Sequence, residues 1–146
     1  MRAKRWIAPL ALSGMAWAGA GMAQQYLGEM VDKPPFAAAY RSLLAGDPRL
    51  PGWLRTGGTA TPAESVTVHG RALQLFSACK PHDCPDEQIL VAYDAASARA
   101  WGVFVRNRNA PDAATPDDVA RTTLRWLGHP DGAMRNAMLR KLRFPE

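Results

Sequence analysis

Cysteine is scarce in this chain, with only two among 146 residues. Two cysteines cannot supply a disulfide framework for a whole fold, so packing of apolar side chains has to stabilise it. The sequence also lacks internal repeats, long low-complexity tracts and a glycine-rich phosphate-binding loop. What is left is a chain of the size of one domain with one core.

Catalytic signatures are missing as well. The sequence contains no Gly-x-Ser-x-Gly and no His-Glu-x-x-His run, and no nucleophile stands beside a base in a recognisable setting. The adjacent acids Asp117 and Asp118 are better explained as a helix start, because neighbouring side chains on a helix point about 100° apart. We therefore expect no enzymatic activity and no cofactor.

Long hydrophobic runs are missing except near the N-terminus. Three basic residues among the first five precede an uncharged stretch over residues 6–18 and a small-residue stretch over residues 18–23. This layout is typical of a secretory signal peptide, and we expect cleavage after Ala23. The apolar part is short for a transmembrane helix, which needs about 20 residues, so a retained anchor is the less favoured interpretation. We expect an exported protein with a single domain over residues 24–146.

Net charge is also small once the leader is removed. Residues 1–23 hold three basic and no acidic residues, which leaves 15 basic against 13 acidic residues in the mature part. A nearly neutral domain has no general attraction for nucleic acid or for a membrane surface. We therefore expect neither as a partner.

Three stretches have the spacing of helices, over residues 36–45, 115–127 and 134–142. Gly46 provides a stop for the first, and Thr115 with Pro116 provides a capping start for the second. The apolar positions of the three stripes are Phe36, Tyr40, Leu43 and Leu44; Val119, Thr123, Trp126 and Leu127; and Met134, Ala137, Met138 and Leu142. Basic residues are frequent at the end of the chain, so we expect residues 133–146 to form a basic helix or tail.

Four short runs between these helices have the composition of strands. They cover residues 66–68, 72–78, 88–93 and 101–106, with turn sequences at residues 69–70 and 95–98. Short connections between successive strands predict an antiparallel meander. The expected fold class is therefore α+β, an antiparallel sheet with flanking helices. We expect Trp53, Trp101 and Trp126 to be core or half-buried side chains rather than parts of a ligand cage.

The two cysteines lie five positions apart and bracket one histidine, in the connection between the second and third predicted strands. The run consists of Cys79, Lys80, Pro81, His82, Asp83 and Cys84. If the cysteines pair, the disulfide and Pro81 stiffen this small ring, and His82 loses little freedom when it binds. An imidazole can donate from both nitrogens, or donate and accept, which suits a cleft that carries carboxylates.

Four interpretations of this run compete. It is a surface disulfide with an incidental histidine, a recognition loop, a zinc site built from Cys79, His82 and Cys84, or a redox-active thiol pair. Three zinc ligands within six residues are cramped, and His69 and His129 have no evident reason to converge on them. The spacing also differs from the Cys-x-x-Cys setting of thiol catalysts.

The ring resembles the inhibitory loop of the Ivy family, bacterial periplasmic inhibitors of vertebrate lysozyme. Four further runs are similar to family motifs, at residues 50–53, 57–63, 77–78 and 129–132. The resemblance extends over residues 36–132. Residues 85–87 and the tail over residues 133–146 depart from the family pattern.

The resemblance implies a periplasmic protein whose disulfide between Cys79 and Cys84 closes a loop that enters a lysozyme active-site cleft. His82 would meet the catalytic carboxylates, while Lys80, Pro81 and Asp83 would shape and anchor the loop. An animal-type lysozyme is the expected partner, endogenous lytic transglycosylases are an alternative target, and a homodimer is expected. A different class of function, exported metal-binding or thiol-active protein, would use Cys79, His82 and Cys84.

Overall fold

The structure of the protein is a computed structural model that describes residues 24–107 and 122–142. Its elements are α1 Leu27–Met30, α2 Phe36–Ala45, the 3-10 helix η1 Gly52–Thr56, β1 Thr59–Val68, β2 Arg71–Cys79, β3 Glu87–Asp94, β4 Arg99–Asn107, β5 Thr122–Leu127 and α3 Gly132–Leu139. The strands form one antiparallel sheet in chain order. The predicted α+β class is confirmed. The expected signal peptide lies outside the described residues.

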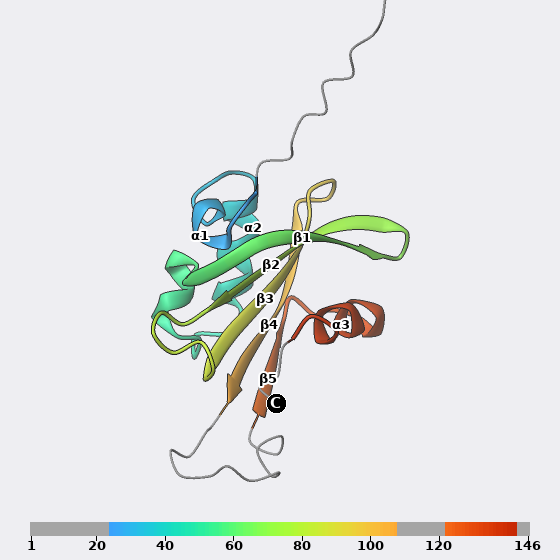
Figure 1. Cartoon of the computed structure of the whole chain (residues 1–146). Coiled ribbons are helices and arrows are strands. Elements are labelled where there is room, and N and C mark those ends of the chain that lie inside the picture. The colour runs from blue at the N-terminus through green and yellow to red at the C-terminus, as the bar shows by residue number, and fades with distance from the viewer. Residues whose placement is uncertain (1–23, 108–121, 143–146) are drawn as a thin grey trace, which may run out of the picture.

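The sheet is covered on both faces, with α1 and α2 on one side and α3 on the other (Figure 1). Strand residues alternate between the two sides because successive side chains of a strand point in opposite directions. Phe76 and Val91 pack with α2, whereas Leu75 and Leu90 pack with α3. The predicted helices over residues 36–45 and near the C-terminus are both present, and they supply these two covers.

Helix α2 contributes the largest apolar contacts on its side. Phe36 is fully buried, and its ring centroid lies 4.9 Å from that of Phe76 and 5.0 Å from that of Tyr93. Tyr40 is also buried, and its hydroxyl donates to the carbonyl oxygen of Leu54 at 2.7 Å. This bond fastens η1, which the sequence did not predict, to α2.

The predicted helix over residues 115–127 is wrong in the part that the structure describes. Residues 122–127 form β5, the edge strand beside β4, and residues 115–121 lie outside the described residues. Leu124 and Trp126 pack on the α3 side, while Leu127 packs on the α2 side. In a segment of only six residues, the spacing of apolar positions does not distinguish a helix from a strand. The alternation between the two sides and the β propensity of threonine and tryptophan favour the strand.

The sheet register fixes where each connection lies. The turn between β1 and β2 carries His69 and Gly70 at positive φ, as expected of a two-residue hairpin turn. Thr59 pairs with Cys79 at the other end of this hairpin. The connection between β2 and β3 therefore lies at the opposite end of the sheet from the β1–β2 turn. Among the described residues, no helix is long and apolar enough to cross a membrane.

Replacing Tyr40 by phenylalanine is expected to lower the free energy of unfolding by about 1–2 kcal/mol, because the carbonyl oxygen of Leu54 loses its donor in a buried site. Burial also raises the pKa of Tyr40, so its hydroxyl remains a donor at neutral pH. Urea denaturation measures the loss. The control is Tyr26→Phe, whose hydroxyl bonds to Gln24 at an exposed position. Equal effects of the two substitutions would contradict the prediction.

Candidate functional site

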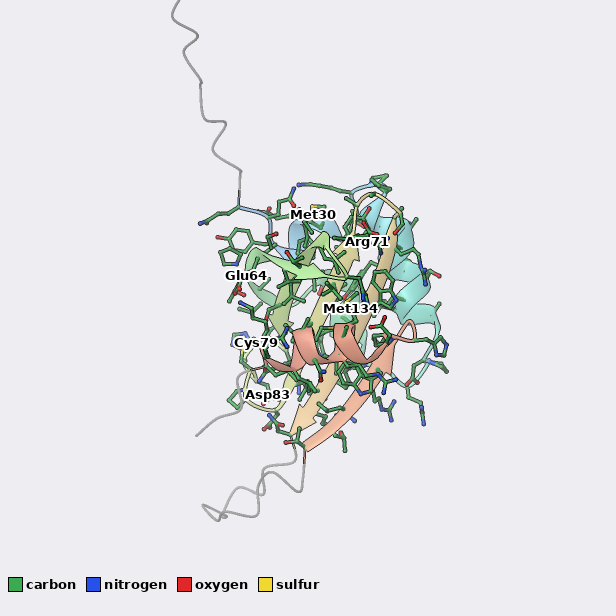
Figure 2. The ribbon with its side chains drawn as sticks, turned by 90° about the vertical axis from the view of Figure 1, so that its right-hand side faces the viewer. Met30, Glu64, Arg71, Cys79, Asp83 and Met134 are labelled. Carbon is green, nitrogen blue, oxygen red and sulfur yellow. A yellow bond between two sulfur atoms is a disulfide. The ribbon has the colours of Figure 1, made fainter. Side chains whose placement is uncertain are left out.

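A six-residue ring at one end of the sheet is the candidate site. Cys79 and Cys84 form a disulfide with their Cα atoms 4.7 Å apart, and it closes residues 79–84 (hereafter the ring). Figure 2 shows Cys79 and Asp83 together at one end of the molecule, away from Met30 and Arg71. The ring lies between β2 and β3, where the sequence predicted it.

The tip of the ring is a tight turn. The amide of Asp83 donates to the carbonyl oxygen of Lys80 at 3.0 Å, which closes a four-residue turn with Pro81 second and His82 third. His82 has a φ of 64°, the left-handed conformation that the third position of a type II turn requires. Pro81 and His82 are both exposed. His82 is therefore exposed at the third position of the turn.

An ion pair crosses the same turn. The ammonium group of Lys80 lies 2.7 Å from a carboxylate oxygen of Asp83. The hydrogen bond raises the pKa of Lys80 and lowers the pKa of Asp83, so both groups are charged at neutral pH. Because the pKa of Asp83 is depressed, its contribution to ring stability is present above the ordinary aspartate value and is lost as pH falls through the lowered value.

The segment that leaves the ring is held by β4. Asn107 donates from its main-chain amide to the carbonyl oxygen of Asp86 at 2.8 Å, and from its side chain to that of Pro85 at 2.6 Å. The hydroxyl of Thr122 on β5 donates to the side-chain oxygen of Asn107 at 2.8 Å. Burial, followed by the neighbouring carboxylate of Asp83, raises the pKa of Asp86. No sequence signal marks Asn107, because its role depends on the register of β4.

A second group of contacts lies directly behind the ring. The carboxylate of Glu87 accepts a hydrogen bond from the indole nitrogen of Trp53 at 2.7 Å, and Arg106 donates to the other oxygen at 3.0 Å. Trp53 is half-buried, as predicted, and it is 34 residues from Glu87 in the chain. Nothing in the sequence connects Glu87, in a segment unlike the family pattern, with Trp53, so this contact was missed.

The other two histidines lie away from the ring. His69 is in the β1–β2 turn and bonds to Asp131 at 2.8 Å, while Asp131 caps α3 by accepting from the amide of Met134 at 2.9 Å. His129 is exposed beyond β5. The disulfide engages both sulfurs of the ring, so neither is a free thiolate that could bind zinc together with His82. Within residues 24–107 and 122–142, no group of three potential ligands is placed to hold a metal.

The ring is a protrusion rather than a receptor. The described surface has a cavity of about 500 Å³, but it lies between α1, α2 and η1, and Val31, Tyr40 and Leu54 contribute to its lining. None of the ring residues lines it. A disulfide-closed turn with an exposed histidine suits insertion into a partner's cleft, because little backbone freedom is lost on binding.

Comparison with known proteins connects this geometry to one family. The family model described as "Inhibitor of vertebrate lysozyme (Ivy)" matches residues 35–143. A protein of Pseudomonas aeruginosa named "Inhibitor of vertebrate lysozyme" is 30% identical over 137 residues, which cover 91% of this chain and 90% of that protein. An Escherichia coli K12 protein with the same name is 42% identical over 90 residues, 62% of this chain and 52% of that protein. An uncharacterised protein of Yersinia pestis is 33% identical over 120 residues, 79% of this chain and 77% of its own length.

Proposed function

The chain belongs to the Ivy family, and from this membership we propose that it is an exported inhibitor of animal-type lysozyme whose ring blocks the enzyme's active-site cleft. Two of the relatives described above are named as inhibitors of vertebrate lysozyme. The observation that carries the proposal is the position of His82, exposed at the tip of a disulfide-closed turn. The protein acts as a binding partner of the enzyme and not as an enzyme.

The chemistry of the target explains why an imidazole is effective. Lysozyme hydrolyses its glycan with one protonated and one ionised carboxyl group that flank the scissile bond. A histidine has two ring nitrogens, so the side chain of His82 can bond to both carboxyl groups at once. Insertion would occlude the sugar-binding site and disturb the protonation of the pair.

The charged groups in the ring and directly behind it are paired with each other. Lys80 pairs with Asp83, and Arg106 pairs with Glu87. Paired charges give little long-range attraction, and the mature domain is nearly neutral. We therefore attribute affinity to shape and to His82 rather than to electrostatic steering of the encounter.

We place this activity in the periplasm. The N-terminal 23 residues have the layout of a signal peptide, and the disulfide of the ring is typical of an oxidising compartment. An inhibitor located there meets lysozyme that has crossed the outer envelope before the enzyme cleaves the cell wall.

Titration of the purified mature protein against animal-type lysozyme, and in parallel against a lytic transglycosylase, tests the proposal. We expect stoichiometric loss of lysozyme activity. Loss of transglycosylase activity alone would make the protein a regulator of endogenous enzymes and would overturn the proposed target.

Size-exclusion chromatography of the same sample tests the expected homodimer.

Replacing Cys79 and Cys84 together by serine is expected to keep the fold and to weaken lysozyme inhibition by about 10-fold, because only the preorganisation of the ring is lost. The free energy of unfolding should fall by about 2 kcal/mol, the chain-entropy value for a loop of this size. Inhibition assays and denaturation measure the two effects. The substitution avoids exposing the enzyme to a reductant. Unchanged inhibition would show that stiffness of the ring is unimportant.

A further inference from the structure

The carboxylate of Glu87 lies at the foot of the ring, with contacts to two other parts of the fold. Its side chain is only 12% exposed. One oxygen accepts from the indole nitrogen of Trp53 at 2.7 Å, and the other lies 3.0 Å and 2.8 Å from two nitrogens of Arg106. We call Trp53, Glu87 and Arg106 the anchor cluster. The two donors are on η1 and β4, elements that lie outside the ring.

The main chain of Glu87 binds the ring itself. Its carbonyl oxygen accepts from the amide of Lys80 at 3.0 Å, and its amide donates to the carbonyl oxygen of Asp83 at 3.3 Å. Glu87 thus bonds to Lys80 and Asp83 of the ring through its backbone. It bonds to Trp53 and Arg106 through its side chain. Glu87 therefore links the base of the ring to η1 and β4.

Trp53 also supports the opposite limb of the ring. Gly58 has a φ of 56°, and a Cβ atom on it would lie 2.4 Å from the carbonyl oxygen of Cys79 and 2.7 Å from the ring of Trp53. Gly58 is thus in close contact with both residues, and no side chain larger than hydrogen fits there without a shift. The indole of Trp53 therefore lies against Gly58, beside the point where the chain enters the ring at Cys79, and it also donates to Glu87, where the chain leaves the ring.

We infer that Glu87 is a positioning residue for inhibition, and that its contacts with Trp53 and Arg106 set the angle at which the ring presents His82. This inference rests on the proposed function, because the effect of Glu87 is measured as a change in the inhibition of lysozyme. The side chain of Glu87 bonds to η1 and β4, and its main chain makes hydrogen bonds to the ring itself. Glu87 has two such contacts, and they lie at the base of the turn that carries His82.

Two conservative substitutions test the inference. Glu87→Gln keeps the size of the side chain and an acceptor for Trp53 but removes the charge that faces Arg106. Trp53→Phe keeps an aromatic side chain but removes the donor to Glu87 together with part of the indole that lies near Gly58. The matched control is Asp94→Asn at the other end of β3, where a carboxylate that is 3% exposed pairs with Arg71 at 2.9 Å.

We expect Glu87→Gln and Trp53→Phe each to raise the inhibition constant for animal-type lysozyme by about 10-fold, the order of effect of losing preorganisation in one contact, while Asp94→Asn changes it by less than about 2-fold. Hydrogen exchange in the free protein provides an independent readout. The amides of Lys80 and Glu87, which bond within this site, should exchange about 10-fold faster in the two variants, with β4 amides unchanged.

The two readouts separate failure of this inference from failure of the proposed function. If the wild-type protein does not inhibit lysozyme but the ring amides exchange faster in the variants, the target is wrong and the positioning role stands. If the wild type inhibits and both variants keep its inhibition constant and exchange rates, the positioning role is overturned. Uniformly faster exchange across the whole sheet would also overturn it, because that result would mean a loss of global stability alone.

Discussion

Replacing His82 by alanine is expected to weaken inhibition of animal-type lysozyme by roughly 30- to 1000-fold while leaving the protein folded, a loss of about 2–4 kcal/mol that is typical of a central interface residue. The imidazole is exposed at the tip of the turn, so its removal creates no cavity in the free protein. In the complex it would leave two carboxyl groups of the enzyme desolvated without a partner. An inhibition titration measures the loss.

The control for this prediction is His129→Ala. His129 is also exposed, and its φ of 54° is close to the 64° of His82, so both substitutions place alanine in the same left-handed conformation. Any backbone strain should therefore be similar in the two variants. We expect His129→Ala to inhibit like the wild type. Full inhibition by His82→Ala at wild-type concentrations would refute the proposed mechanism.

Replacing Phe36 by alanine is expected to lower the free energy of unfolding by about 3–5 kcal/mol, the range for removal of a buried aromatic side chain. Phe36 is fully buried, and its ring lies 4.9 Å from Phe76, 5.0 Å from Tyr93 and 5.6 Å from Tyr40, centroid to centroid. Its loss would leave a cavity between α2 and the sheet that these three rings cannot close. Guanidinium denaturation followed by circular dichroism measures the effect.

Phe36→Leu serves as the control because it keeps most of the apolar volume, and we expect it to cost roughly half as much or less. The ring is at the end of the sheet, where it bonds to Glu87 on β3 and its Cys79 pairs with Thr59 on β1. Under conditions where Phe36→Ala remains folded, its inhibition constant should match that of the wild type. A loss of less than about 1 kcal/mol for Phe36→Ala would contradict the packing described for this core.

Much of the fold was accessible from local patterns. The stripe of Phe36, Tyr40 and Leu43 predicted α2, and the pair His69 and Gly70 predicted the β1–β2 turn. Both predictions are confirmed. Helix spacing and hairpin turns depend on residues close together in the chain, so both can be predicted without knowledge of the rest of the fold.

The error at β5 has the opposite cause. Thr123, Trp126 and Leu127 fit a helical stripe, but Trp126 pairs with Val103 and Leu127 with Gly102 on β4. A strand of six residues is stabilised by the neighbour it pairs with and by the layers that cover it. Neither contribution is visible in its own sequence, and β propensity depends strongly on such context.

The same distinction applies to the candidate site. The sequence by itself located the ring between two strands, identified His82 as its central residue and indicated the family, because six adjacent residues and a few short motifs carry that information. Only the tertiary structure decided what holds the ring in place. Trp53 and Arg106 reach Glu87 across 34 and 19 positions of the chain, and such contacts exist only once the strand register and the packing of η1 are fixed.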